Sequence, residues 1–172
     1  MQNKIREITL NQWLETVLAD KSLDVTPASE DASFRRYFRV QRGGETWIAM
    51  DAPPDKEDCR PFVKIAAAFR FMGMNVPEVY AQDLDNGFLL LTDFGSICYL
   101  DRLNQRNADD LYADAMHALL DLQSHEKPRN VDLPAYDEVL LRQEMGLFND
   151  WFLDRHVQIR LDESEASDLQ VV

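Results

Sequence analysis

A short basic segment carries the clearest chemical signal in this sequence. Arg35 and Arg36 stand side by side after Ser33 and Phe34, in a chain whose 18 Lys and Arg are outnumbered by 31 Asp and Glu, for a formal net charge of −13. A cluster of guanidinium groups on an acidic protein attracts anions and donates charge-assisted hydrogen bonds to phosphate oxygens. The segment therefore suits a phosphate group. The alternative is that its arginines form the solvated face of a strand, which the alternation favours for Arg35 and Arg39.

The other reactive side chains form no recognisable motif. Cys59 and Cys98 lie far apart in the sequence, without a Cys-x-x-Cys pair or paired histidines nearby. This spacing argues against a disulfide framework and against a zinc site. The six glycines do not combine into a Walker A phosphate loop.

Composition narrows the class of protein. The acidic balance argues against nucleic-acid binding, because phosphate backbones are held by excess cations. With 45% hydrophobic and 28% charged residues, the 172-residue chain has the composition of one globular domain or slightly more. No run of roughly 18 apolar residues and no signal segment occurs, so we expect a cytoplasmic protein with reduced thiols and no membrane partner.

The elements that must position the basic segment follow from the apolar spacing. A helix is expected around apolar residues 10–18, with Thr9 as its N-cap. Residues 33–40 and 45–51 alternate in polarity on either side of a Gly-Gly pair, which predicts a β-hairpin. A second helix covers about 57–72. Two further strands follow it, EVYAQ and GFLLLTD, joined by an Asp-Asn-Gly turn.

From residue 96 the apolar period becomes helical. Helices are expected over 108–123 and about 136–156, and the sequence stops where another begins near Ser164 or Ser167. The sequence thus predicts an α+β protein. A small antiparallel sheet with one packed helix occupies residues 1–95, and residues 96–172 contain helices with no strand of consequence.

This order of elements is that of a kinase-like fold, and four stretches make the resemblance specific: SFRRYFRV, WIAMDAPP, NVPEVYAQD and NGFLLLTDFG. They resemble the N-lobe of the aminoglycoside phosphotransferase and choline kinase superfamily. Together with LPAYDEVLLRQEMGLFNDWFL, the stretches SFRRYFRV and MDAPPDKED most resemble the bacterial cell-wall amino-sugar kinases, which phosphorylate the anomeric hydroxyl of N-acetylmuramate and N-acetylglucosamine. The resemblance covers nearly all of this chain but only about the first half of that family.

The resemblance implies a division into a nucleotide-binding N-lobe, 1–95, and an incomplete helical C-lobe, 96–172. It implies ATP as cofactor and Mg²⁺ held by residues of the missing half. The loop that closes over the ATP phosphates falls at Ser33, Phe34, Arg35 and Arg36, and we prefer Arg36 over Arg35 as a phosphate ligand because Arg36 shares its face with apolar residues. The adenine-contacting hinge falls at Thr92, Asp93 and Phe94.

Two features of the superfamily are absent from their expected places. Its third strand normally carries a lysine that pairs with a glutamate on the next helix, whereas Ala49 stands at the matching strand position and the glutamate position falls in the apolar stretch 61–63. Both partners are missing together, which leaves no unpaired buried charge. Arg36, Lys56 and Lys64 are candidates to meet the phosphate charge instead.

The catalytic residues of the superfamily are also not found. Asp93-Phe94-Gly95 spells the metal-binding triplet of protein kinases, but no histidine of a catalytic loop precedes it, so we assign it to the hinge. None of His117, His125 and His156 is followed by the Asp and Asn that phosphoryl transfer requires. The chain itself therefore lacks the catalytic Asp and the metal ligands.

Two functions remain open from the sequence. The first is the N-terminal part of an ATP-dependent kinase whose acceptor is a sugar hydroxyl, with aminoglycosides or choline as alternative acceptors. The second is a non-catalytic nucleotide-binding or partner-binding remnant. In the first case the partners are a nucleotide and a small-molecule substrate.

Overall fold

The computed structural model describes residues 2–30, 33–128, 131–162, 164, 165 and 167. The chain divides into two compact units, Met1–Val131 and Asp132–Val172, which are described separately. The boundary expected at residue 95 separates the sheet from the helices that follow it. It is not the boundary between these two units, and it stays a prediction.

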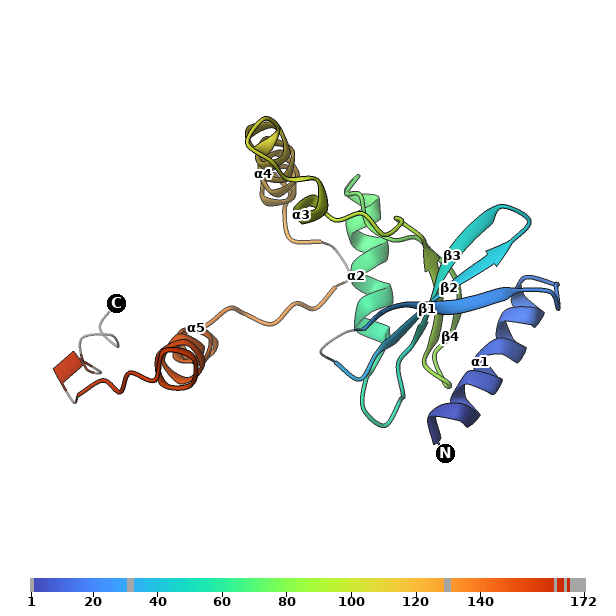
Figure 1. Ribbon diagram of the computed structural model, residues 1–172, viewed down its shortest axis with the longest axis horizontal. Coiled ribbons are helices and arrows are strands. Elements are labelled where there is room, and N and C mark those ends of the chain that lie inside the picture. Colours follow the sequence, from blue (N-terminus) through green and yellow to red (C-terminus); the bar gives the residue numbers. More distant parts are fainter. Residues whose placement is uncertain (1, 31–32, 129–130, 163, 166, 168–172) are drawn as a thin grey trace. The chain divides into compact units, whose positions relative to one another are not determined.

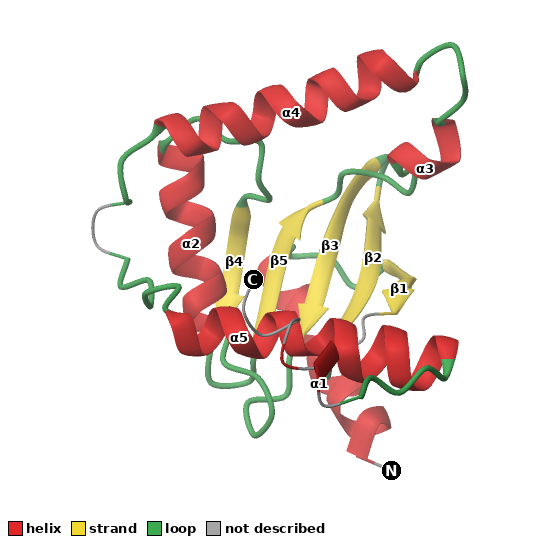
Figure 2. Cartoon of the chain, turned by 90° about the vertical axis from the view of Figure 1, so that its left-hand side faces the viewer, coloured by secondary structure: helices red, strands yellow, loops and turns green. Residues whose placement is uncertain are grey.

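The first unit is built on one antiparallel sheet of five strands (Figures 1 and 2). In chain order the strands are β1 (Asp24–Glu30), β2 (Arg36–Arg42), β3 (Glu45–Asp51), β4 (Val79–Asp83) and β5 (Phe88–Thr92). Their order across the sheet is β1-β2-β3-β5-β4, so β3 lies at the centre and β4 at one edge. Together with the helices, this sheet confirms the predicted α+β class.

Each face of the sheet is covered by one helix, and Figure 1 shows the sheet between the two. Successive side chains of a strand point to opposite faces. On one face, Leu10 and Leu14 of α1 (Gln2–Val17) pack with Val40, Ala49, Phe88 and Leu90. On the other face, α2 (Arg60–Phe71) packs with the neighbouring strand residues, which are Met50, Leu89 and Leu91. We call these the α1 face and the α2 face.

The helical region begins with α3 (Tyr99–Arg102) and α4 (Ala108–Ser124) in the first unit. The second unit contains α5 (Glu138–Leu147), which continues as the π-helix η1 (Phe148–Val157). No described residue after Thr92 lies in a strand, as the change of apolar period predicts. The helix expected at the end of the sequence falls largely outside the described residues.

One local prediction is wrong and one strand was not predicted. Thr9 is not a helix cap, because α1 already begins at Gln2 and the Thr9 hydroxyl donates to the Ile5 carbonyl within the helix, at 3.1 Å. Strand β1 was not predicted, because its alternation is short and is interrupted at Pro27. Proline is tolerated there because β1 lies at an edge of the sheet and its pairing with β2 shifts register just after Pro27.

None of the described helices is both long and apolar enough to cross a membrane.

Candidate nucleotide site

The two adjacent arginines of the basic segment lie on opposite faces of the sheet. Tyr37 belongs to the core of the α2 face and Phe38 to that of the α1 face. The alternation along β2 therefore places Arg36 on the α1 face, and it places Arg35 and Arg39 on the α2 face with Tyr37. The predicted alternation is confirmed, and it separates the two expected phosphate ligands.

On the α1 face, Arg36 is held by two carboxylates. Its Nε donates to Oδ2 of Asp51 at 3.1 Å and its Nη1 to Oε1 of Glu7 at 2.7 Å. Asp51 is fully buried and also accepts from Nε of Arg6, at 2.9 Å. Arg6 in turn donates to the carbonyl of Asn86, at 2.7 Å. We call Arg6, Glu7, Arg36 and Asp51 the Asp51 charge cluster; only Asp51 in it is fully buried, its two cations and two anions balance, and it ties α1 to β2 and β3.

On the α2 face, Arg35 is paired with one carboxylate instead of two. Its Nη2 donates to Oε2 of Glu57 at 3.2 Å, and the two side chains keep 29% and 18% of their surface exposed. Partial burial works to lower the pKa of Arg35, but hydrogen bonding to Tyr37 and the charge of Glu57 outweigh it, so the pKa is raised. The backbone N–H of Arg35 also donates to the hydroxyl of Ser33, at 3.1 Å.

A second cation lies at the same end of the sheet. Nζ of Lys56 stands 5.8 Å from the centre of the Phe34 ring. This contact brings the loop after β3 against the segment that leads into β2. Lys56 is half exposed, and its ion pair with the neighbouring Asp55 is long, at 3.8 Å. Lys64, the third candidate cation, is an exposed residue of α2.

The hinge residues lie at the opposite end of β2. Nε and Nη2 of Arg39 donate to the two carboxylate oxygens of Asp93 at 2.7 and 3.1 Å, and the N–H of Gly95 donates to Asp93 at 2.8 Å. The hydrogen bonds from Arg39 lower the pKa of Asp93. The carboxylate is therefore used within the protein, while Phe94 is exposed and Thr92 accepts from the backbone N–H of Glu78.

Between these two ends the α2 face offers a partly open surface. Arg35 and Arg39 are four residues apart, which corresponds to roughly 13 Å along a strand. Tyr37 and Ile48 lie between them and are only partly buried. This face therefore has Arg35 and Lys56 at one end, Arg39 and the predicted hinge residues at the other, and an apolar and aromatic surface between them.

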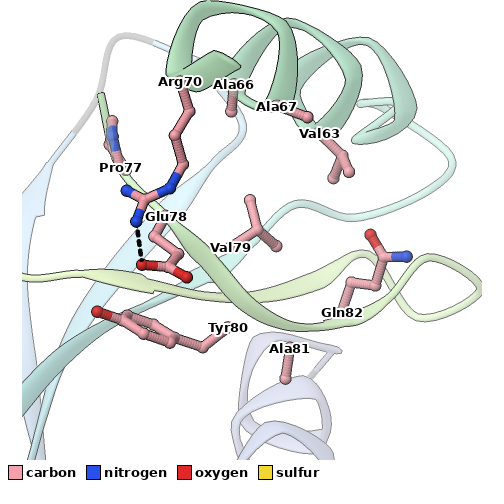
Figure 3. A pocket seen from close by; sticks show the side chains of 10 residues that line it. All are labelled: Val63, Ala66, Ala67, Arg70, Pro77, Glu78, Val79, Tyr80, Ala81 and Gln82. Carbon is pink, nitrogen blue, oxygen red and sulfur yellow. Dashed lines mark ion pairs between the residues drawn. The ribbon is translucent and has the colours of Figure 1, made fainter. Parts of the chain in front are cut away.

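A hollow that could hold a ligand also lies away from this face's Arg35 end. A groove of about 400 Å³ runs between α2 and the edge strand β4, and Figure 3 shows Arg70 reaching across it to Glu78. That ion pair measures 2.7 Å. The groove is lined by short apolar side chains such as Val63, Ala66 and Val79, and none of the predicted site residues lines it. We therefore do not assign the nucleotide to this groove.

Comparison with known proteins gives the family. Residues 24–171 match the sequence model described as "Phosphotransferase enzyme family". The chain belongs to this phosphotransferase family. Relatives include N-acetylmuramate/N-acetylglucosamine kinases from three bacteria. The Pseudomonas aeruginosa protein is 46% identical over 94% of this chain and 50% of its own length. The Pseudomonas putida protein is 42% identical (99% and 53%), and the Neisseria meningitidis protein 36% (88% and 46%). The chain thus spans about half the length of these relatives.

The structure shows on which face of the sheet Ala49, the residue at the predicted position of the strand lysine, lies. Ala49 is buried on the α1 face, whereas a side chain that pairs with a residue on α2 must point to the α2 face. On β3 that face carries Ile48 and Met50, and the assignment of Ala49 to the lysine position stays a prediction. Strand β3 contains no lysine, and Ala49 and Met50 are both uncharged and fully buried.

The three histidines and the acidic side chains form no cluster of the kind that proteins use for a metal held by side chains alone, as far as the described residues go. No three His, Cys, Asp or Glu side chains in the described part of the chain lie close enough together to hold a metal ion. His117 lies on α4, His125 contacts the carbonyl of Asp121 at 2.6 Å, and His156 lies beside Phe152 on η1.

Sequence reasoning missed the carboxylates that hold the arginines. Asp51 ends the apolar run of β3, and a carboxylate at the end of a buried strand requires a cationic partner. That signal was present in the sequence. Glu57 carries no comparable signal, because it lies in a charged loop whose position only the fold determines.

Proposed function

We propose that this chain is the ATP-binding part of a kinase that phosphorylates a sugar hydroxyl, with N-acetylmuramate and N-acetylglucosamine as the acceptors. The family and the names of its relatives support this proposal. The observation that carries it is the α2 face of β2 and β3, which has cations at one end and the hinge at the other. We also propose that the protein acts in the cytoplasm.

The nucleotide would lie along the α2 face. Adenine would contact the backbone of Thr92, Asp93 and Phe94, because hinge N–H and C=O groups pair with its ring edge. The phosphates would reach the other end, where Ser33 and Phe34 lead into β2 and Arg35 supplies a cation. Arg36 lies on the opposite face, so in this proposal it anchors the loop through Asp51 and Glu7 and does not touch phosphate.

We include Mg²⁺ in this proposal only because the family suggests it. When bound, it would neutralise charge on the transferred phosphoryl group. The described residues offer no cluster that fits it, so its ligands and the catalytic carboxylate are expected in the half that this chain does not cover.

The test has two parts. Calorimetry of the 172-residue chain should detect ATP binding, and radiolabelled ATP should show no phosphate transfer to N-acetylmuramate, N-acetylglucosamine, kanamycin or choline. A chain extended with the second half of the Pseudomonas aeruginosa relative should phosphorylate the two N-acetylated sugars first. Absence of ATP binding by both chains would refute the proposal, and preferential turnover of kanamycin or choline would redirect it to another acceptor.

A further inference from the structure

We infer that Glu57 positions Arg35 for the nucleotide phosphates, and that this pair takes over the task of the strand lysine and helix glutamate found in other kinases. The inference rests on the proposed function, since it names the residues that serve the same site. It assigns a role to Glu57, which lies within the stretch MDAPPDKED and to which the sequence analysis gave no function.

The cations at this end of the sheet are not equivalent. Arg36 points to the α1 face and donates to Asp51 and Glu7, one of which is fully buried. Lys56 is half exposed on a turn and sits over the Phe34 ring. Arg35 alone among these three both faces the proposed nucleotide surface and is oriented by a mostly buried carboxylate.

Glu57 lies on a segment that the fold holds at both ends. Its N–H donates to the carbonyl of Pro53 at 2.9 Å, in the turn that leaves β3. Two residues later, Cys59 is buried in the core of the α2 face and is the N-cap residue of α2. The carboxylate is therefore fixed relative to both the sheet and the helix, which is what a group that orients another side chain requires.

The geometry leaves Arg35 able to bind a second anion. A guanidinium has five N–H donors in a planar fork. One nitrogen, Nη2, donates to Glu57, and Tyr37 supplies a second polar contact. The pair keeps part of its surface exposed, so a phosphate can approach the remaining donors while Glu57 holds the plane of the guanidinium.

The comparison with other kinases explains why such a pair is needed here. In protein kinases, a lysine on the third strand pairs with a glutamate on the following helix, and both must be in place for activity. In this chain Met50 occupies the corresponding face of β3, and the helix begins with Arg60, Pro61 and Phe62. In this inference the cation is Arg35, which precedes β2, and the carboxylate is Glu57, which precedes α2.

The experiment compares ATP with adenosine, which lacks phosphates, by calorimetry on the 172-residue chain. Arg35→Met should weaken ATP binding by roughly 10- to 100-fold, the range for a lost hydrogen bond between charged groups. Glu57→Gln, which keeps the shape but removes the charge, should weaken it by about 3- to 10-fold. Adenosine affinity should change by less than about twofold in both, because the hinge is intact. Arg35→Lys should recover part of the ATP affinity.

Arg60→Met is the matched control. Arg60 lies three residues after Glu57 and pairs with exposed Asp58 at 3.1 Å. Its replacement should leave the ratio of ATP to adenosine affinity unchanged. If the Arg35–Glu57 pair is merely structural, its removal will lower thermal stability but leave the ratio of ATP to adenosine affinity unchanged. That result would overturn the inference.

The remaining outcomes separate the inference from the proposed function. If neither the 172-residue chain nor the extended chain binds ATP or adenosine, the proposed function fails. If either chain binds both and its Arg35 and Glu57 variants keep the same affinity ratio, only the inference fails. Tighter ATP binding by Glu57→Gln would show that the carboxylate competes with phosphate, which contradicts a positioning role.

Discussion

The two faces of the sheet use consecutive arginines in different ways. On the α1 face, Arg36 is matched by Glu7 and by the fully buried Asp51, which Arg6 also contacts. On the α2 face, Arg35 makes one 3.2 Å ion pair with Glu57. The two arginines are similarly exposed, at 25% for Arg36 and 29% for Arg35, so they differ in their partners. Arg36 is bound to a fully buried carboxylate, so exchanging that partner for a ligand would leave Asp51 buried with one cation fewer. Arg35 has a single carboxylate partner that is not fully buried, so it is able to serve a ligand.

Replacement of Asp51 should have the largest effect on stability. Asp51→Ala leaves Arg6 and Arg36 without their shared buried acceptor, and removal of one partner of a buried ion pair costs about 3–5 kcal/mol. Urea unfolding followed by circular dichroism measures this loss. Asp55→Ala, on the exposed turn that follows, should change the free energy of unfolding by less than about 0.5 kcal/mol. Equal losses for the two variants would show that the cluster contributes little to folding.

The same replacement at Arg36 and at Arg35 should lower the free energy of unfolding by different amounts. Arg36→Met should lower the free energy of unfolding by roughly 2–3 kcal/mol, because it leaves Asp51 with one cation and Glu7 with none of its described partners. Arg35→Met should lower it by less than about 1 kcal/mol, the value of a partly exposed pair. Differential scanning calorimetry of both variants provides the measurement. A larger loss for Arg35→Met would reverse the roles assigned to the two faces.

The smallest expected effect concerns acid stability at the hinge. Hydrogen bonds from Arg39 hold the pKa of Asp93 below its ordinary value of 3.8. A lowered folded-state pKa contributes stability that is fully present well above the unfolded pKa and is lost as pH falls through the folded pKa. Unfolding free energies between about pH 2 and pH 6 should therefore fall less steeply in Asp93→Asn than in the wild type.

A control for the hinge keeps the carboxylate but removes its cation. Arg39→Met should show the same shallower pH dependence as Asp93→Asn, because the ion pair is lost in both. If the two variants retain the wild-type slope, the acid sensitivity arises from other carboxylates. Asp83 is one, since hydrogen bonds from Asn86 lower its pKa.

Local patterns in the sequence predicted most of the fold. The alternation in SFRRYFRV, the Gly-Gly turn and the change to a helical period after residue 95 correspond to β2, its turn and the absence of described strands thereafter. These signals are local because strand and helix periodicities repeat over a few residues. Strand β1 escaped prediction because its pairing with β2 overrides a sequence that contains Pro27.

The sequence by itself determined that Arg35 and Arg36 point to opposite faces of one strand, since a strand has a period of two. Only the tertiary structure decided which face serves which purpose. Glu7 and Arg6 come from a helix about 30 residues earlier, and Asp51 and Glu57 from the far side of a hairpin. The pairing of these charges depends on how α1 and the segment before α2 pack on the sheet, and that packing depends on buried apolar contacts between distant parts of the chain.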